Sequence, residues 1–349
     1  MRNRTYLTVL LGASLLGAPL AQSAPFFGTA QSALVDRYPV GGEGGWDLIT
    51  FDAKRHRLFV SRATHVQVVD ADSGKVIGDI PGTEGVHGIA LADDLNVGFT
   101  SNGKSNSVTV FDSTTLNVID TIKISGLNPD VILYEPNTKH IFVFNGRSNN
   151  ATVIDAVSHQ EIDTIVLPGK PELAVIDEAG NVFVNIEDKN QVVVIDSGHD
   201  KIIKTFPLGK GVEPTGLSID KEHKRLFSVC ANRKMEILDA ETGSLVAEVA
   251  IGAEPDSAAF DPHLGLAFSS NGDGTLTVVQ DLEHGHYAVV QNVMTQKGAR
   301  TMAYDPDRHR AYLVAAAFGA TPPATKEHPR PKPVIIPDSF VVLVVSFAP

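Results

Sequence analysis

A repeat of just over forty residues runs along most of the chain and constrains its fold more than any other feature. Each copy carries an apolar run that ends in aspartate. Five of these aspartates follow one another at intervals of 42, 43, 41 and 43 positions, namely Asp70, Asp112, Asp155, Asp196 and Asp239. A sixth copy ends at Asp281. Self-similarity at this period is typical of architectures in which each unit packs against its neighbours, so it predicts one repetitive domain.

Each repeat contains four short apolar runs, separated by turn sequences such as Asp-Ser-Gly at 72–74. A second run precedes the aspartate run and occurs seven times, at residues 57–60, 97–100, 140–143, 181–184, 225–228, 266–269 and 310–313. No stretch shows a sustained helical period. Four antiparallel strands in a unit of this length are typical of a propeller blade, so we predict an all-β fold.

Seven copies of the second run predict a seven-bladed β-propeller with four antiparallel strands per blade. The last copy lacks a fourth strand after residues 341–347, whereas residues 33–41 read as a fourth strand without a repeat of its own. Pairing these two segments would close the ring and remove two open sheet edges. We therefore expect an N-terminal strand to join the last blade, within a single domain over residues 25–349.

Residues 1–24 have the pattern of a secretory signal peptide. Arg2 and Arg4 precede an apolar stretch over residues 7–16, and small residues follow it. That stretch is too short to span a bilayer, and no other long apolar segment occurs. We expect a cleaved leader and a periplasmic or secreted protein without a transmembrane segment. Cys230 is the single cysteine, so no internal disulfide can form.

The first repeat also carries a family resemblance. Its sequence has Arg-Leu-Phe-Val at 57–60, Val-Gln-Val-Val-Asp at 66–70, Gly-Lys-Val-Ile at 74–77 and Ile-Pro-Gly at 80–82. These motifs resemble the YVTN β-propeller repeat family, and in particular its exported YncE-like members. The resemblance covers nearly the whole mature chain and implies the propeller fold and export. Relatives and look-alikes of that family bind single-stranded DNA, coat cell surfaces or act as lyases, and no catalytic motif of theirs maps onto this chain.

The loops that lead into the first strand of each blade are the natural place for a site, because in a propeller that strand lines the central channel. Their polar and aromatic side chains are Trp46, Asp47, His87, Asp130, Glu172, Asp256 and Arg300. Four carboxylates near one axis would attract a divalent cation such as calcium, held by Asp47, Asp130, Glu172 and Asp256. Arg300 and His87 would then hold an anionic group, with Trp46 as an apolar wall. The alternative is that these acids are solvated and cap backbone N–H groups around a wet channel.

A proline-rich insertion over residues 318–337 interrupts the last repeat between its second and third strands. Its six prolines favour an extended path with few internal hydrogen bonds. Because the insertion starts on the face that carries the candidate site, it is either a lid or partner-binding segment, or a loop without such a role.

These patterns favour a non-catalytic binding or scaffold protein that recognises a small ligand or a cell-envelope partner at the channel face. An alternative is a metal-assisted lyase or lactonase that uses the carboxylate ring, with His87 as acid or base. Single-stranded nucleic-acid binding is a weaker alternative, because the formal net charge of −12 repels phosphates. Nucleotide-binding, haem-attachment and hydrolase motifs are all missing from the sequence. We expect a monomer.

Overall fold

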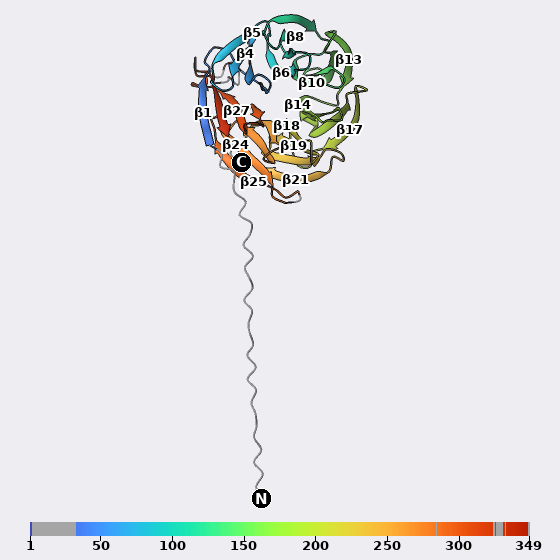
Figure 1. Cartoon of the computed structure of the whole chain (residues 1–349), viewed down its shortest axis with the longest axis vertical. Helices are drawn as coiled ribbons and strands as arrows, with labels where there is room; N and C mark the ends of the chain where they lie inside the picture. Colours follow the sequence, from blue (N-terminus) through green and yellow to red (C-terminus); the bar gives the residue numbers. More distant parts are fainter. Residues whose placement is uncertain (2–32, 284, 324, 326–330, 332, 348–349) are drawn as a thin grey trace.

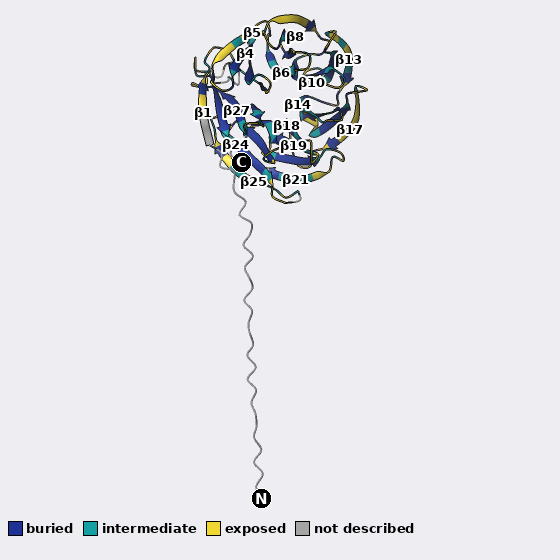
Figure 2. Ribbon diagram, in the orientation of Figure 1, coloured by how far each residue is buried: buried dark blue, intermediate teal, exposed yellow. Residues whose placement is uncertain are grey.

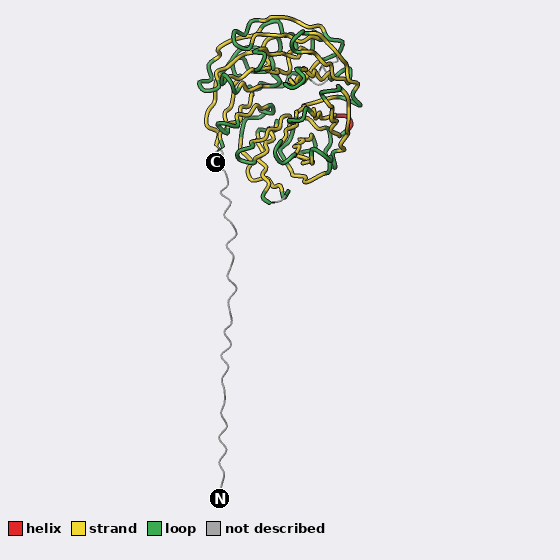
Figure 3. Tube along the Cα trace, turned by 45° about the vertical axis from the view of Figure 1, so that its right-hand side comes forward, coloured by secondary structure: helices red, strands yellow, loops and turns green. Residues whose placement is uncertain are grey.

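Seven four-stranded antiparallel sheets lie around a common axis in the computed structural model (Figure 1). The structure describes Met1 and residues 33–283, 285–323, 325, 331 and 333–347. Seen from an oblique direction, strands alternate with loops and turns around the ring, and the 3-10 turn η1 (Glu187–Lys189) is the helical segment of the described chain (Figure 3). The predicted all-β, seven-bladed propeller is confirmed.

Each sheet runs from an inner strand beside the axis to an outer strand at the rim. Blades 1 to 3 are β2 (Ile49–Asp52), β3 (Arg57–Arg62), β4 (His65–Asp70) and β5 (Val76–Ile80); β6 (Val86–Ala92), β7 (Val97–Asn102), β8 (Ser107–Asp112) and β9 (Val118–Lys123); and β10 (Pro129–Glu135), β11 (His140–Asn145), β12 (Asn150–Asp155) and β13 (Gln160–Val166). Blades 4 and 5 are β14 (Pro171–Ile176), β15 (Asn181–Ile186), β16 (Gln191–Asp196) and β17 (Lys201–Pro207); and β18 (Pro214–Asp220), β19 (Arg225–Cys230), β20 (Lys234–Asp239) and β21 (Leu245–Ala250). Blades 6 and 7 are β22 (Pro255–Asp261), β23 (Leu266–Asn271), β24 (Thr275–Asp281) and β25 (Tyr287–Met294); and β26 (Met302–Asp305), β27 (Arg310–Ala315), β28 (Val341–Ser346) and β1 (Ala33–Pro39).

The last blade takes its outer strand from the other end of the chain. β1 pairs antiparallel with β28, so that Tyr38 lies opposite Val342 and Pro39 opposite Val341. Tyr38 also reaches the neighbouring first blade, where its hydroxyl donates a hydrogen bond of 3.1 Å to the carbonyl of Asp72. This pairing confirms the predicted ring closure. Within the described chain, β1 covers the edge of β28 that would otherwise be left without a partner strand.

The repeated aspartate terminates the third strand and organises the turn that follows. Asp70 accepts a hydrogen bond of 2.8 Å from the backbone N–H of Ser73, and Asp112 accepts one of 2.7 Å from the N–H of Thr115. Hydrogen bonds from the Ser73 side chain and backbone hold the pKa of the Asp70 carboxyl below its usual value. The most regular signal in the sequence is therefore turn chemistry, with no bearing on a ligand site.

The apolar core lies between adjacent blades. Phe59 of blade 1 packs against Phe111 of blade 2 with ring centroids 5.6 Å apart, and Phe227 of blade 5 stacks on Phe260 of blade 6 at 5.3 Å. The middle strands are buried, whereas the outer strands are largely exposed (Figure 2). Each buried side chain of this size contributes about 1.5–3 kcal/mol relative to its exposed state, so neighbouring blades stabilise one another and hold the channel residues in place.

Several expectations fall on residues outside this description. The expected signal peptide lies outside it except for Met1, and so does the middle of the proline-rich insertion. The described ends of the insertion pair through an isolated bridge between Phe318 and Ile335. No helix among the described residues is long and apolar enough to cross a membrane.

Candidate site at the channel mouth

One position at the start of the innermost strand recurs in all seven blades and forms what we call the channel-mouth ring. In each blade, one residue of the first strand pairs with the fourth residue of the second strand. The ring position lies two residues before that residue of the first strand. In chain order the ring consists of Asp47, His87, Asp130, Glu172, Thr215, Asp256 and Arg300. In five blades the register shifts at this position, and a bulge of this kind turns a side chain away from the regular alternation.

Hydroxyl groups from neighbouring blades fix the backbone of the channel-mouth ring. Ser101 donates to the carbonyl of Asp130, Ser270 donates to the carbonyl of Arg300, and Thr301 donates over 2.7 Å to the carbonyl of Asp47. The last of these bonds connects blade 7 to blade 1, across the join of the ring. Because each bond joins a ring residue to a neighbouring blade, contacts between blades help to hold Asp47, Asp130 and Arg300 in place.

Three ring members from consecutive blades converge. Nδ1 of His87 lies 2.5 Å from Oδ2 of Asp47 and 3.7 Å from Oδ1 of Asp130. One atom from each of the three side chains falls within 4.8 Å of the other two, which is compact enough for a shared cation. The imidazole packs on Gly103, where a Cβ atom would lie 2.7 Å from Nε2 of His87, so this face of the site has no room for a larger residue.

The other charged members of the ring lie in separate ion pairs. Lys170 contacts two carboxylates, with Nζ at 2.6 Å from Oε1 of Glu172 and 2.5 Å from Oε2 of Glu187. Nε of Arg300 lies 3.2 Å from Oδ2 of Asp256. These cations neutralise part of the acidic ring, whereas among the described residues Asp47 and Asp130 form their ion pairs with His87 and with no lysine or arginine.

Burial raises the pKa values of three carboxyls of the ring, those of Asp130, Glu172 and Asp256. Burial raises the pKa of Asp256 to about 6, with the charges of Asp47 and Asp130 adding to the effect and Arg300 opposing it. Burial also raises the pKa of Glu172 to about 8, although Lys170 lowers it, and raises the pKa of Asp130. Carboxyls that hold protons in this way release them when a cation takes their place.

The pKa of His87 is also raised, which in an imidazole favours the charged form, whereas in a carboxyl it favours the neutral form. Burial lowers the pKa of the imidazole, but the hydrogen bond with Asp47 and the charges of Asp130, Asp47 and Glu172 outweigh burial and raise that pKa overall. The raised pKa shows that the surrounding field stabilises positive charge at this point of the channel mouth.

Trp46 lies beside the ring but faces the last blade. Its ring centroid is 5.3 Å from that of Phe340 and 5.9 Å from that of Phe318, at the base of the proline-rich insertion. The structure thus places Trp46 as a partly buried anchor for these two aromatic residues. The other six predicted site residues all occupy the ring, of which Asp47, His87 and Asp130 are mutually close.

Lys170 and Glu187 belong to the site but were not selected from the sequence. Lys170 stands two residues before Glu172, a spacing that places both side chains on one face of an extended segment, so this signal was readable. Glu187 comes from the turn after β15, and its approach to Lys170 depends on how that turn folds.

Comparisons with known proteins support the fold. No family model matches the chain, and no curated protein matches it. The solved hydrazine synthase of Kuenenia stuttgartiensis superposes with a TM-score of 0.70 at 18% identity, over 85% of this chain and 97% of the other. The solved structure of U3-55K superposes with a TM-score of 0.72 at 10% identity, over 87% and 96%. At these identities the likeness shows a shared propeller architecture and nothing about activity.

Proposed function

We propose that this chain is an exported binding protein of the YVTN, YncE-like type, which holds a cationic ligand at its channel mouth without transforming it. The observation that carries the proposal is the convergence of Asp47, His87 and Asp130 from three separate blades. Within the ring and its contacts, carboxylates outnumber lysine and arginine, so the mouth attracts positive charge. The ligand is a divalent cation, or a small molecule or cell-envelope partner that carries a cationic group.

The donor set of the cluster indicates which cations fit. Calcium prefers six to eight oxygen ligands, and a calcium site built from four carboxylates was the expectation from the sequence. The cluster instead combines one imidazole nitrogen with the carboxylate oxygens of Asp47 and Asp130, while Glu172 and Asp256 lie with Lys170 and Arg300. Imidazole together with carboxylate suits Zn²⁺ or Mn²⁺ better than Ca²⁺.

Removal of a single donor is expected to weaken the binding of Zn²⁺ or Mn²⁺ about tenfold or more, as measured by isothermal titration calorimetry. The substitutions are Asp47→Asn, His87→Ala and Asp130→Asn, of which the asparagine variants keep the shape of the side chain. His65→Ala is the matched control, because His65 is 29% exposed like His87 and also faces an aspartate, Asp79. Equal affinities in all four variants would contradict the proposal, as would no saturable binding of either ion at about 1 mM.

Cation affinity is expected to rise about tenfold or more between pH 5.5 and pH 8.5. The carboxyls of Asp256 and Glu172, with pKa values raised to about 6 and about 8, hold protons in the folded protein at pH values where an unfolded chain has lost them. Without a cation, rising pH through this window therefore lowers the stability of the folded state. A cation held by Asp47, His87 and Asp130 does not contact these two carboxyls, but its charge lowers their pKa values, so they release protons when it binds and the loss of stability is reversed. Calorimetry in two buffers of different ionisation enthalpy measures the proton release directly, and pH-independent affinity would refute the expectation.

A metal-assisted lyase or lactonase is the second candidate. The observation in its favour is Glu172, whose pKa of about 8 would allow a carboxyl to donate a proton at neutral pH. The two candidates differ in the role of this residue. If Glu172 belongs to a reactive metal centre, Glu172→Ala releases the ion as Asp130→Ala does. If the chain is a binding protein with a cluster of three donors, Glu172→Ala leaves the ion bound.

A further inference from the structure

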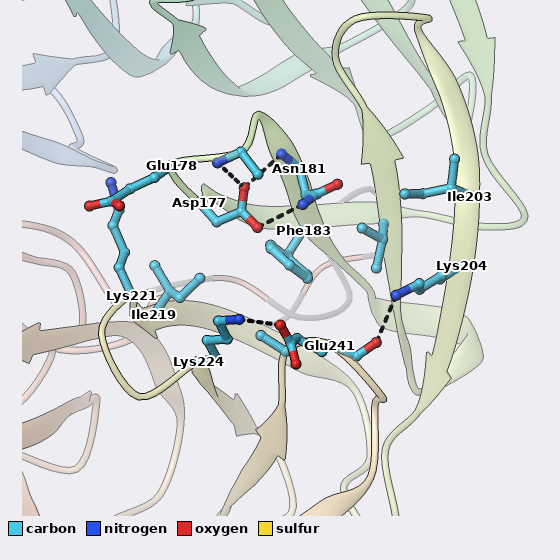
Figure 4. A pocket seen from close by; sticks show the side chains of 13 residues that line it. Asp177, Glu178, Asn181, Phe183, Ile203, Lys204, Ile219, Lys221, Lys224 and Glu241 are labelled. Atoms are coloured by element: carbon cyan, nitrogen blue, oxygen red, sulfur yellow. Dashed lines mark hydrogen bonds and ion pairs between the residues drawn. The ribbon is translucent and has the colours of Figure 1, made fainter.

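A cleft opens between blades 4 and 5 (Figure 4). Residues of the turn between β14 and β15 line it, so it lies at the opposite end of the inner strands from the channel mouth. Its volume is about 460 Å³, which lies in the range of small-molecule sites. Apolar side chains form its floor, with Phe183, Val194 and Ile219 among them. A neighbouring cavity of about 550 Å³ shares Glu178, Ile219 and Lys221 with the cleft, so these three residues lie where the two spaces meet.

At the cleft, blade 4 has a short side chain where blades 1 and 3 have a longer one that reaches the next blade. In blades 1 and 3, the side chain of the first residue of the second strand reaches the next blade. Arg57 donates to the carbonyl of Ser113, and Nδ1 of His140 lies 3.2 Å from Oδ1 of Asp200. In blade 4 this position is Asn181, whose amide turns back to Asp177 over 2.7 Å. Ala179 and Gly180 add no bulk, so the space that an arginine or histidine would fill stays open.

Most charges around the cleft already have partners. Lys224 pairs with the side chain of Glu241, and Nζ of Lys204 donates to the carbonyl of Glu241 over 2.7 Å. Asp177 accepts hydrogen bonds from its own turn. Among the charged lining residues of the described chain, Glu178 and Lys221 have neither a hydrogen bond nor an ion pair. They lie at one end of the cleft, one on each wall, with Ile219 next to Lys221 and Phe183 farther along the cleft (Figure 4).

We infer that this cleft binds a small zwitterion with an apolar body, which is the chemistry of a free α-amino acid with a large apolar side chain. The ammonium group meets Glu178, the carboxylate meets Lys221, and the side chain covers the apolar floor at Phe183 and Ile219. An α-amino acid fits because its two charges sit together at one end, as the two unpaired residues do. A peptide carries its terminal charges at opposite ends and matches the arrangement less well.

The test is calorimetric titration of the intact protein with L-phenylalanine. Saturable binding with one site per chain is expected. Phenylacetate and 2-phenylethylamine each lack one charge, so each should bind about tenfold more weakly or worse. Lys221→Met and Glu178→Gln should weaken L-phenylalanine by a similar factor, and Lys75→Met is the control because Lys75 is an exposed lysine in blade 1.

Asn181→Arg provides a second kind of variant, because it restores the residue that blades 1 and 5 carry at the same position. It should abolish binding by filling the cleft, while thermal unfolding shows that the variant folds. No saturable heat with L-phenylalanine up to about 10 mM would overturn the inference. Affinity unchanged in both Lys221→Met and Glu178→Gln would overturn it too. Asp47→Asn leaves this cleft intact, so the outcome is independent of the channel-mouth proposal.

Discussion

Replacement of Arg62 by alanine is expected to lower the free energy of unfolding by about 3–5 kcal/mol. Arg62 is 1% exposed and is the largest of the fully buried side chains in the described chain. Its guanidinium donates to the carbonyls of Gly41 and Glu43 at 2.9 and 3.0 Å, and lies 3.9 Å from the ring centroid of Phe340. The substitution removes these contacts and leaves a cavity beside Phe340.

The reason for so large an effect is that Arg62 joins three parts of the ring. It ends the second strand of blade 1, it holds the segment that leads from β1 into that blade, and it packs on the last blade through Phe340. Burial lowers the pKa of its guanidinium to about 10, so the side chain stays charged at neutral pH.

Urea unfolding followed by circular dichroism measures the loss, and Arg147→Ala is the control. Arg147 is exposed in the corresponding loop of blade 3, so its removal should change stability by less than about 0.5 kcal/mol. Equal stabilities of the two variants would show that the contacts of Arg62 contribute nothing net.

Replacement of Tyr38 by alanine is the second large expectation, with a loss of about 3–5 kcal/mol in the free energy of unfolding. Tyr38 is 6% exposed and packs across the join between the last blade and the first. Its ring lies against Gly74, where a Cβ atom would come within 2.2 Å of the tyrosine. Without the ring, β1 loses its main contact with blade 1, and the apolar strand β28 becomes prone to lose its partner.

The conservative variant separates packing from hydrogen bonding. Tyr38→Phe keeps the ring and removes only the hydroxyl, which donates to the carbonyls of Ala71 and Asp72 at 3.3 and 3.1 Å. It should therefore cost about 1 kcal/mol. Thermal unfolding at several scan rates, combined with light scattering, reports both the loss of stability and any association through the exposed strand. If both variants unfolded like the wild type, the closure of the ring would not depend on Tyr38.

The fold was predictable because the strands repeat with a period that the turn residues mark. Asp70 and Asp112 end the third strands of their blades, as the repeat interval predicted. Residues 33–41 were recognisable as a strand that belonged to no repeat. Alternation of apolar residues over such short runs suffices when it recurs seven times, since each copy tests the others.

The candidate site was predictable in its composition but not in its grouping. The position in the repeat identified Asp130 and Glu172 as neighbours on the channel, yet one joins His87 and the other joins Lys170. Which partner a carboxylate meets depends on the bulge at the start of each inner strand and on hydroxyls such as Ser101, and these are contacts between blades. The period of the sequence carries no information about them. Trp46 illustrates the same point, because its neighbours Phe318 and Phe340 lie far away along the chain.

The backbone of the propeller repeats seven times, but the side chains at the channel mouth have no rotational symmetry. Around the axis, the ring positions carry in turn an acid, a histidine, two acids, a threonine, an acid and an arginine. A ligand rotated by one blade about the axis would meet a different arrangement of charges, so one orientation of the ligand is favoured. Exchanging Thr215 with a charged member of the ring would therefore change the preferred orientation of the ligand, or create a second one. The backbone of the propeller would stay the same, so ligand orientation can change without a change of fold.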